Sequence, residues 1–214
     1  MISRHQRLAT VIADIDCANV DDPRRITVAN AEKASEVVYA ERMSERLAKM
    51  YPHASELLQI AARAQHIRRW EIARANYPEG RNGYNDWRKA CREHHAQLVG
   101  AILACRGYED WEINHVVKLV KKEQLKKDPE SQALENVVDL VFIEHYMEEF
   151  LDKYRHYDED KLIDIVAKIL RKMSPKGHAE ALALALAPRM RSLIDKAMAR
   201  DADVLARLAT LARD

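Results

Sequence analysis

Turn-forming residues are scarce in this chain, and their scarcity limits the folds that it can adopt. Of 214 residues, 5 are glycine and 6 are proline, which is about half of their share in an average protein. A sandwich or barrel of short strands needs a turn after each strand and cannot be built with so few. We therefore expect an all-α fold, a single compact bundle of about eight to ten helices.

Hydrophobic residues recur with helical spacing along most of the chain. Leu8, Val11, Ile12 and Ile15, for example, follow the i, i+3, i+4, i+7 pattern of a helix with one buried face. The pattern predicts helices over roughly residues 3–18, 29–50, 55–74, 85–106, 110–126, 128–153 and 158–173, then helices that begin at Ser174 and at Asp201, with an interruption at Pro188.

Residues 76–84, with the sequence NYPEGRNGY, form the one irregular stretch that is rich in helix breakers. The stretch is also aromatic and basic, and binding residues tend to lie on loops that a rigid scaffold carries. We expect a binding loop here, within an α-helical core domain over residues 1–173. Residues 174–214 are rich in Ala, Leu and Arg, which is typical of closely packing helices. They are expected to form a C-terminal extension that packs either on the core or at a subunit interface, where it would make a homodimer.

Charge and cysteine content exclude several classes of protein. Lys and Arg number 35 and Asp and Glu 34, a balance that argues against strong nonspecific binding to nucleic acid. The three cysteines lack the spacing of a metal site and suggest reduced thiols. No apolar run approaches the ~20 residues of a membrane span, and the first residues lack the apolar region of a signal peptide. We expect a cytoplasmic protein that does not enter a membrane.

Two carboxylates occur within the most apolar predicted helix. Glu135 and Asp139 lie four residues apart in the segment LENVVDLVFI, residues 134–143, and so share one face of the helix. Burying an unpaired carboxylate costs several kcal/mol, so each needs a partner. Two interpretations stay open at this point: ion pairs with arginines that face the core, or ligands for a metal.

Histidines on the preceding helices would complete a metal site. His66 and the pair His94-His95 lie within helical patterns, and imidazole with carboxylate suits Mn, Fe, Ni or Zn. A histidine beside an apolar face is also commonly a core residue with its hydrogen bonds satisfied. The metal interpretation assigns His66, His95 and Asp139 as ligands and Glu135 as the catalytic group that orients or deprotonates water.

Basic and aromatic residues gather around the irregular stretch. Guanidinium groups match phosphate or carboxylate oxygens, and the rings of Trp70, Trp87 and the tyrosines could stack on a base or sugar. The alternative is an ordinary solvated, charged face. The candidate substrate-binding residues are Arg69, Arg74, Tyr77, Arg81, Tyr84 and Arg88.

Several strings of residues match a known family pattern. They are Ile15-Asp16, Asp22-Pro23, residues 36–43 and 64–70, Arg74, Tyr77-Pro78, Gly80-Arg81, Gly83-Tyr84, Trp87-Arg88, Gly107-Tyr108, Lys122, Leu125-Lys126, and residues 132–135 and 141–144. Over about residues 15–150 the chain resembles the family catalogued as domain of unknown function 4202. Because the family name assigns no activity, the resemblance implies membership and a fold but no reaction.

A looser similarity is to the HD-type metal-dependent phosphohydrolases, which are all-helical. Their ligand order, His, His-Asp and a later Asp, would be represented here by His66, the pair His94-His95, and Asp139 or Glu135. The chain departs from the pattern because no Asp follows either histidine of the pair. This similarity implies an HD-like bundle that holds a divalent metal.

Three functions follow as hypotheses, and only the first makes the protein an enzyme. In the first, the protein is a metal-dependent hydrolase of a small phosphorylated or nucleotide-like compound, with Mn, Fe, Ni or Zn as cofactor. In the second, it is a non-catalytic module whose Arg, Tyr and Trp side chains bind an anionic small molecule or a protein carboxylate. In the third, it is an interaction scaffold that acts through its C-terminal helices.

Overall fold

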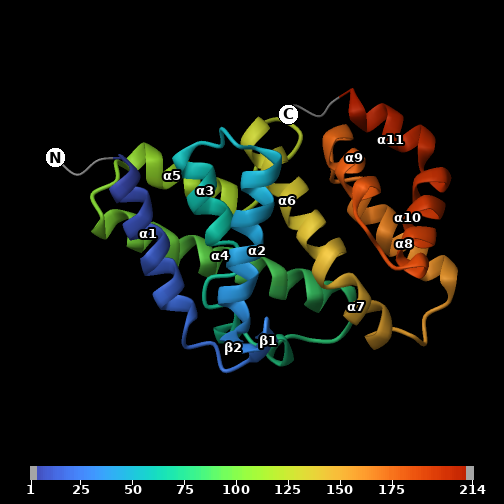
Figure 1. Ribbon diagram of the computed structural model, residues 1–214, viewed down its shortest axis with the longest axis horizontal. Coiled ribbons are helices and arrows are strands. Elements are labelled where there is room, and N and C mark those ends of the chain that lie inside the picture. The colour runs from blue at the N-terminus through green and yellow to red at the C-terminus, as the bar shows by residue number, and fades with distance from the viewer. Residues whose placement is uncertain (1–3, 211–214) are drawn as a thin grey trace. The chain divides into compact units, whose positions relative to one another are not determined.

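The structure, a computed structural model, describes residues 4–210 and the side chains of residues 6–210. Within this range it contains eleven α-helices, two short 3-10 helices and one two-stranded sheet (Figure 1). The expected all-α fold class is therefore confirmed. The chain divides into two compact units, Met1–Glu123 and Gln124–Asp214, called unit 1 and unit 2 below. The domain boundary that composition places after residue 173 stays a prediction.

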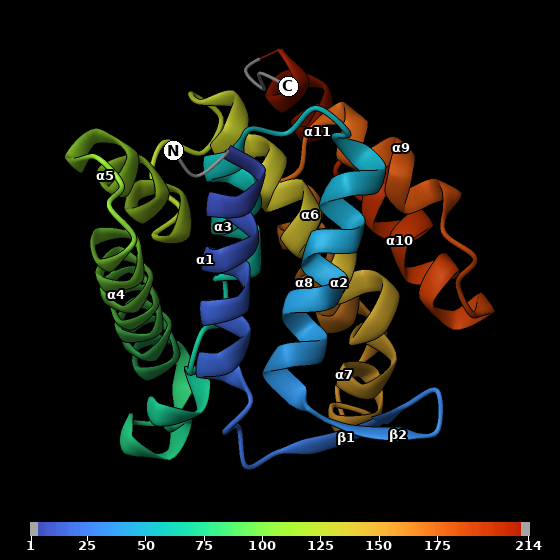
Figure 2. The same cartoon turned by 60° about the vertical axis from the view of Figure 1, so that its left-hand side comes forward.

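Unit 1 is built from helices that pack around a shared apolar interior. Helix α1 contacts α2, α3 and α4, while α5 packs along both α3 and α4 (Figures 1 and 2). Val11, Ile15, Met43, Leu47 and Ile60 are among its fully buried side chains. Its elements are α1 (Arg4–Asn19), β1 (Arg25–Val28), β2 (Ala31–Ala34), α2 (Ser35–Met50), α3 (Glu56–Arg63), the 3-10 helices η1 (Arg69–Glu71) and η2 (Arg74–Asn76), α4 (Gly80–Cys105) and α5 (Asp110–Val120).

A β-hairpin precedes α2 where the sequence pattern predicts the start of a helix. Strands β1 and β2 pair antiparallel, from Arg25 opposite Ala34 to Val28 opposite Ala31. The two residues of the turn, Ala29 and Asn30, have φ values of 49° and 65°, the left-handed conformation that a two-residue hairpin turn requires. The expected helical start at residue 29 is wrong, because two consecutive left-handed residues cannot begin a right-handed helix.

Left-handed residues also end two predicted helices early. The helix expected to reach residue 74 stops at Arg63 and is followed by turns in which Arg68 has a φ of 48°. The helix expected to reach residue 126 stops at Val120, before left-handed Lys122, Gln124 and Lys126. The loop expected over residues 76–84 is wrong in its second half, since α4 already begins at Gly80.

Unit 2 consists of α6 (Pro129–His145), α7 (Met147–Lys153), α8 (Glu159–Leu170), α9 (Pro175–Ala183), α10 (Pro188–Arg200) and α11 (Ala202–Ala209). Within this unit α9 packs against α6, and α10 packs against α8. The side chains of Asp128, Asp158 and Ser174 accept hydrogen bonds from first-turn N–H groups, as N-caps do. The predicted starts of these three helices are confirmed.

Two other expectations in unit 2 need correction. The helix predicted over residues 128–153 is broken at Tyr146, where φ is −130°. Asp201 does precede the last helix, but its carboxylate accepts a hydrogen bond from Arg171 Nε at 2.6 Å and caps no backbone N–H. The homodimer expected through residues 174–214 stays a prediction.

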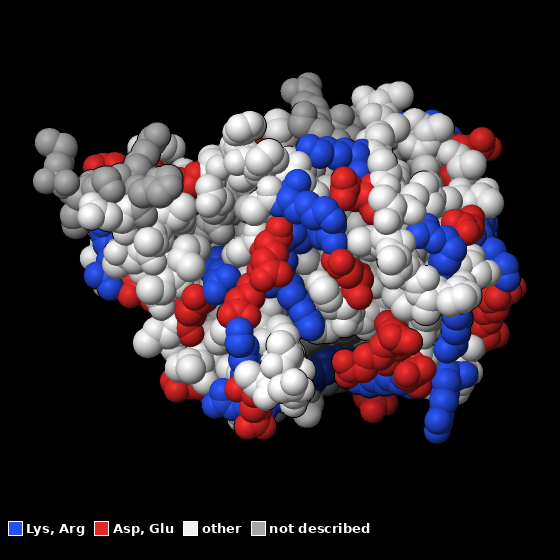
Figure 3. All heavy atoms as spheres, viewed as in Figure 1, with Lys and Arg blue, Asp and Glu red and all other residues white. Residues whose placement is uncertain are grey.

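The surface carries both signs of charge. On the face that Figure 3 shows, the basic and acidic side chains of the described residues are interspersed with uncharged ones. Among residues 4–210, no helix is both long and apolar enough to cross a membrane.

Candidate functional site

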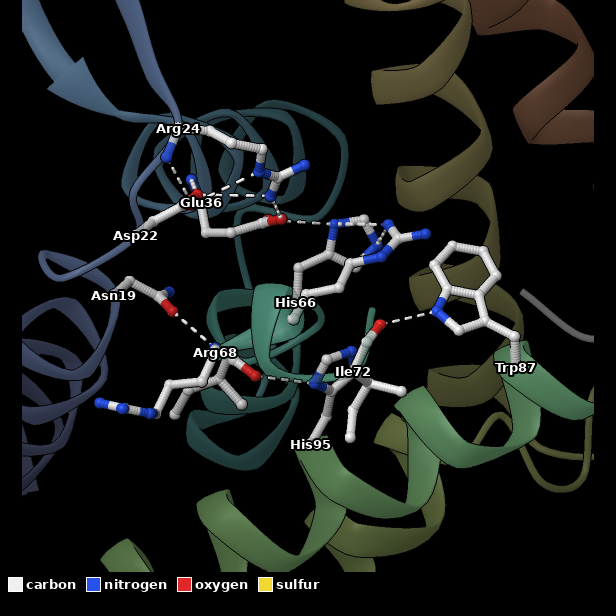
Figure 4. A network of polar contacts seen from close by, with 11 residues as sticks. Asn19, Asp22, Arg24, Glu36, His66, Arg68, Ile72, Trp87 and His95 are labelled. Atoms are coloured by element: carbon white, nitrogen blue, oxygen red, sulfur yellow. Dashed lines mark hydrogen bonds and ion pairs between the residues drawn. The ribbon is translucent and has the colours of Figure 1, made fainter. Parts of the chain in front are cut away.

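The turn that follows α3 holds an unusual backbone conformation and carries the central residues of the site. Arg68 is left-handed, a conformation that costs a non-glycine residue roughly 1–2 kcal/mol. Two side chains fix it: Asn19 Oδ1 accepts a hydrogen bond from Arg68 N at 2.9 Å, and His95 Nδ1 donates to the carbonyl oxygen of Ile67 at 2.8 Å (Figure 4). Strained backbone residues cluster at functional sites, and this one lies between His66 and Arg69.

His66 is held on both ring nitrogens. Its Nδ1 lies 3.3 Å from Oε2 of Glu36, and Nη1 of Arg69 lies 2.7 Å from Nε2 and 3.1 Å from Nδ1. A guanidinium group can only donate hydrogen bonds. We assign Nε2, the nearer ring nitrogen, as its acceptor, and Nδ1, which lies beside the Glu36 carboxylate, as the nitrogen that carries the proton. The ring also stacks on Tyr39, with centroids 3.7 Å apart and planes inclined by 10°.

Glu36, in the first turn of α2, is a buried carboxylate with two further contacts. It forms an ion pair with Arg24, and its backbone N–H donates to Oδ2 of Asp22 at 3.0 Å. Asp22 is fully buried and also accepts from the backbone N–H of Arg24. Burial raises the pKa of Glu36, while the charges of Arg24 and Arg69 oppose that rise.

Cations surround the imidazole of His66. Burial lowers the pKa of His66 well below its ordinary value, and the charges of Arg69, Lys122, Arg24 and Arg88 lower it further. These four cations are called the cationic cluster below. Figure 4 shows one of them, Arg24, with its partners Asp22 and Glu36 next to His66. The charges of the cluster thus favour the neutral form of the His66 ring.

His95 is the second neutral imidazole of the site. It is 2% exposed, and burial followed by the neighbouring His66 lowers its pKa to about 3. The two rings have centroids 6.1 Å apart. His94, the other member of the sequence pair, instead faces Glu71, with Nε2 at 3.0 Å from Oε2.

Aromatic side chains from the first turns of α4 lie next to the cluster. The guanidinium of Arg69 lies 4.8 Å from the centroid of the Trp87 ring, and Trp87 Nε1 donates to the carbonyl oxygen of Ile72 at 2.8 Å. Tyr84 and Trp87 have centroids 5.7 Å apart, and the guanidinium of Arg88 lies 5.8 Å from the Tyr84 ring. Three of the candidate substrate-binding residues, Arg69, Tyr84 and Arg88, are therefore neighbours.

The other three candidates lie elsewhere on the same segment. Arg74 Nη1 donates to the carbonyl oxygen of Tyr77 at 2.8 Å, which ties together the segment before α4. Tyr77 is half-buried and Arg81 is exposed. In the structure, Arg74 and Tyr77 shape the segment that carries the site.

Glu135 and Asp139 belong to unit 2 and share one partner there. Nζ of Lys172 lies 2.7 Å from Oε1 of Glu135 and 2.5 Å from Oδ1 of Asp139. Of the two sequence-based interpretations, the ion pair is the one that these contacts display, with a lysine in place of the expected arginine. Both carboxylates raise the pKa of Lys172 against the effect of its burial, so the lysine is charged.

The described residues do not provide a ready metal site. Among them, no group of three His, Cys, Asp or Glu side chains is disposed to hold an ion. The proposed ligands His66 and His95 are in unit 1 and Asp139 is in unit 2. Arg69, Lys122, Arg24 and Arg88 all act on His66 by their positive charge, and such a surrounding disfavours a divalent cation. The Mn, Fe, Ni or Zn cofactor stays a prediction.

Sequence reasoning missed four members of the site: Asp22, Arg24, Glu36 and Lys122. Asp22, Lys122 and the segment that begins at Glu36 do occur in the family pattern quoted above, which was the available signal. Periodicity could not find them, because the hairpin and the left-handed turns that bring them to His66 were not foreseen.

A family model matches residues 9–194, with the description Domain of unknown function (DUF4202). The chain belongs to this family. The match includes every residue of the cationic cluster and runs from α1 into α10 of this DUF4202 chain. No curated protein and no solved structure matches it. The similarity to HD-type phosphohydrolases is shown by none of these comparisons and stays a hypothesis.

Proposed function

We propose that the cationic cluster of unit 1 binds an anionic small molecule through a phosphate-type group. The observation that carries the proposal is the gathering of guanidinium groups at a neutral imidazole: Arg69 contacts the ring of His66, and Arg24 pairs with Glu36 beside it. An anion that enters this network would be attracted by the guanidinium groups of Arg24 and Arg69.

Arg69 is the cation best placed to meet the anion. Its hydrogen bond to His66 goes to a neutral ring, and its planar face lies over Trp87. A guanidinium bonded in this way keeps a full charge for a phosphate, which it can bind with two parallel N–H donors. Arg88, whose guanidinium lies over Tyr84, offers a second fork on the same side of α4.

Isothermal titration calorimetry with inorganic phosphate and pyrophosphate tests this proposal. We expect both anions to bind, pyrophosphate more tightly, with affinities that fall as salt is added. Arg69→Gln should weaken binding about tenfold or more, the effect of losing one charge-assisted pair. The matched control is Arg106→Gln, which removes an exposed arginine that pairs with Asp14 in the same unit. Absence of binding, or an equal loss in the control, would overturn the proposal.

A second candidate function, hydrolysis of a phosphate ester, is favoured by the pair of Glu36 and His66. A carboxylate beside Nδ1, here at 3.3 Å, can orient an imidazole so that its Nε2 exchanges protons. Once the ligand has drawn Arg69 away, Nε2 would take a proton from water as the oxygen–phosphorus bond forms. It would return the proton to the ester oxygen as the old bond breaks.

An assay of phosphate-ester hydrolysis, which measures the inorganic phosphate released, distinguishes this candidate from a binding module. His66→Ala should abolish the release while leaving the helical signal in circular dichroism unchanged. Metal analysis of protein purified without an affinity tag tests the metal-dependent form. Bound Mn, Fe, Ni or Zn, with a lower Tm after chelation, would support that form. Without metal and without hydrolysis, only the binding module stands.

A further inference from the structure

The aromatic pair Tyr84 and Trp87 adjoins the cationic cluster through two arginine side chains. Arg69 reaches Nε2 of His66 at 2.7 Å and at the same time lies 4.8 Å from the centroid of the Trp87 ring. Arg88 makes a second connection. Its charge lowers the pKa of His66, and its guanidinium lies 5.8 Å from the ring centroid of Tyr84. A molecule that places an anion among these cations therefore has an aromatic surface beside it.

One face of this pair is open to solvent. Tyr84 is 44% exposed and is one of the four large hydrophobic residues that lie exposed in the described part of the chain. Trp87, in contrast, is half-buried and anchored by its N–H to Ile72. Packing within the fold explains Trp87, but it does not explain an exposed tyrosine one helical turn before Arg88.

The pair is held rigidly before any ligand arrives. A Cβ atom at Gly83 would lie 2.0 Å from the carbonyl oxygen of Pro78, so the first turn of α4 sits directly on the preceding segment. That segment is tied by the hydrogen bond from Arg74 to Tyr77 O. Rigid aromatic surfaces lose little entropy when a ring stacks on them, and stacking tolerates any flat ring.

We propose that the ligand is a phosphate ester that carries a planar aromatic ring, as nucleoside phosphates do, and that the ring stacks on Tyr84. This inference rests on the proposed function, because the phosphate of the same molecule occupies the cationic cluster. It adds a requirement that anion binding alone does not make: the ring contributes to affinity independently of the charge.

Calorimetry with adenosine monophosphate, ribose 5-phosphate and inorganic phosphate tests the inference. The nucleotide should bind about tenfold more tightly than ribose 5-phosphate, which has the same phosphate and sugar but no ring. Tyr84→Ala should remove that advantage and leave the affinity for ribose 5-phosphate unchanged, whereas Tyr84→Phe should keep it. Trp111→Ala, which removes an aromatic side chain 66% exposed on α5, serves as the control and should change nothing.

The outcomes distinguish a failure of this inference from a failure of the proposed function. Equal affinities for the nucleotide and ribose 5-phosphate, or no effect of Tyr84→Ala, would overturn the aromatic requirement and leave anion binding intact. If none of the three compounds binds, the proposed function fails and the inference fails with it. Arg69→Gln should weaken the binding of the nucleotide and of ribose 5-phosphate to the same extent. A loss confined to one of them would contradict the shared phosphate position.

Discussion

Oε2 of Glu36 lies 3.3 Å from Nδ1 of His66, and this contact joins the first turn of α2 to the turn that follows α3. It places a buried carboxylate beside the imidazole, within the cationic cluster. Glu36 therefore has two opposing effects: it stabilises the arrangement of the site, and it competes with any anion that binds there.

Glu36→Gln should separate these two effects. The amide keeps the shape of the side chain but removes its charge, so phosphate affinity should rise severalfold while the free energy of unfolding falls by about 1.5–3 kcal/mol. Calorimetry and urea denaturation measure the two quantities. A variant that stays folded but no longer binds phosphate would show that Glu36 contacts the ligand, contrary to this account.

The pH dependence of stability should show the effect of the lowered pKa of His95. Its pKa in the folded protein, about 3, is far below the ordinary value of 6.5. Between these values the unfolded chain binds a proton that the folded chain does not. Stability is therefore fully present above pH 6.5 and declines as the pH falls, by up to about 1.4 kcal/mol per pH unit for this histidine. His66 acts in the same direction, and Glu36, with its raised pKa, acts against it near its own titration.

Urea denaturation at pH 7, 6 and 5 measures this slope. His95→Asn keeps a donor for the carbonyl oxygen of Ile67 but cannot take up a proton, so its slope should be shallower than that of the wild type. Identical slopes would mean that His95 has the same pKa in the folded and the unfolded protein, contrary to this account.

Two glycines of α4 should respond oppositely to the same substitution. Gly83→Ala places a Cβ 2.0 Å from Pro78 O, so backbone must move, and we expect a loss of about 2–4 kcal/mol. At Gly100 the nearest atom is 3.6 Å away, and alanine should stabilise the helix by about 0.5–1 kcal/mol. Thermal denaturation of both variants checks this. A stable Gly83→Ala protein would contradict the rigid seating of the aromatic pair.

Lys172 should be essential to the stability of unit 2. Lys172→Met leaves Glu135 and Asp139 buried without their shared cation, and we expect destabilisation by about 3–5 kcal/mol. The control is Lys168→Met, whose exposed pair with Asp164 should contribute less than about 1 kcal/mol. Adding Glu135→Gln and Asp139→Asn to Lys172→Met should restore much of the loss. If it does not, the buried charges are not the cause.

Local signals in the sequence predicted the helical fold and several helix starts, because the chemistry of an N-cap lies within a few residues. Asp128, Asp158 and Ser174 are examples. The left-handed residues Ala29, Arg68 and Lys122 could not be predicted in this way, since none is a glycine. Their conformations are held by pairing or by distant partners, such as Asn19 for Arg68.

In the candidate site too, only the residues that are close together in the sequence could be predicted. Arg69, Tyr84 and Arg88 were found because they lie close together in the sequence near the breaker-rich stretch. Glu36 was missed because its partner His66 is 30 positions away and is reached only through the fold. Lys172 was missed as the partner of Glu135 for the same reason: no pattern in the sequence pairs residues 37 positions apart.

Side-chain NMR of the histidines during a phosphate titration tests the central claim most directly. If the anion binds at the cationic cluster, the ring resonances of His66 should shift and saturate together with the heat measured by calorimetry. Those of His156 in unit 2 should stay constant, and Arg69→Gln should suppress the shift of His66. Phosphate that binds by calorimetry while the His66 resonances remain unchanged would contradict the account.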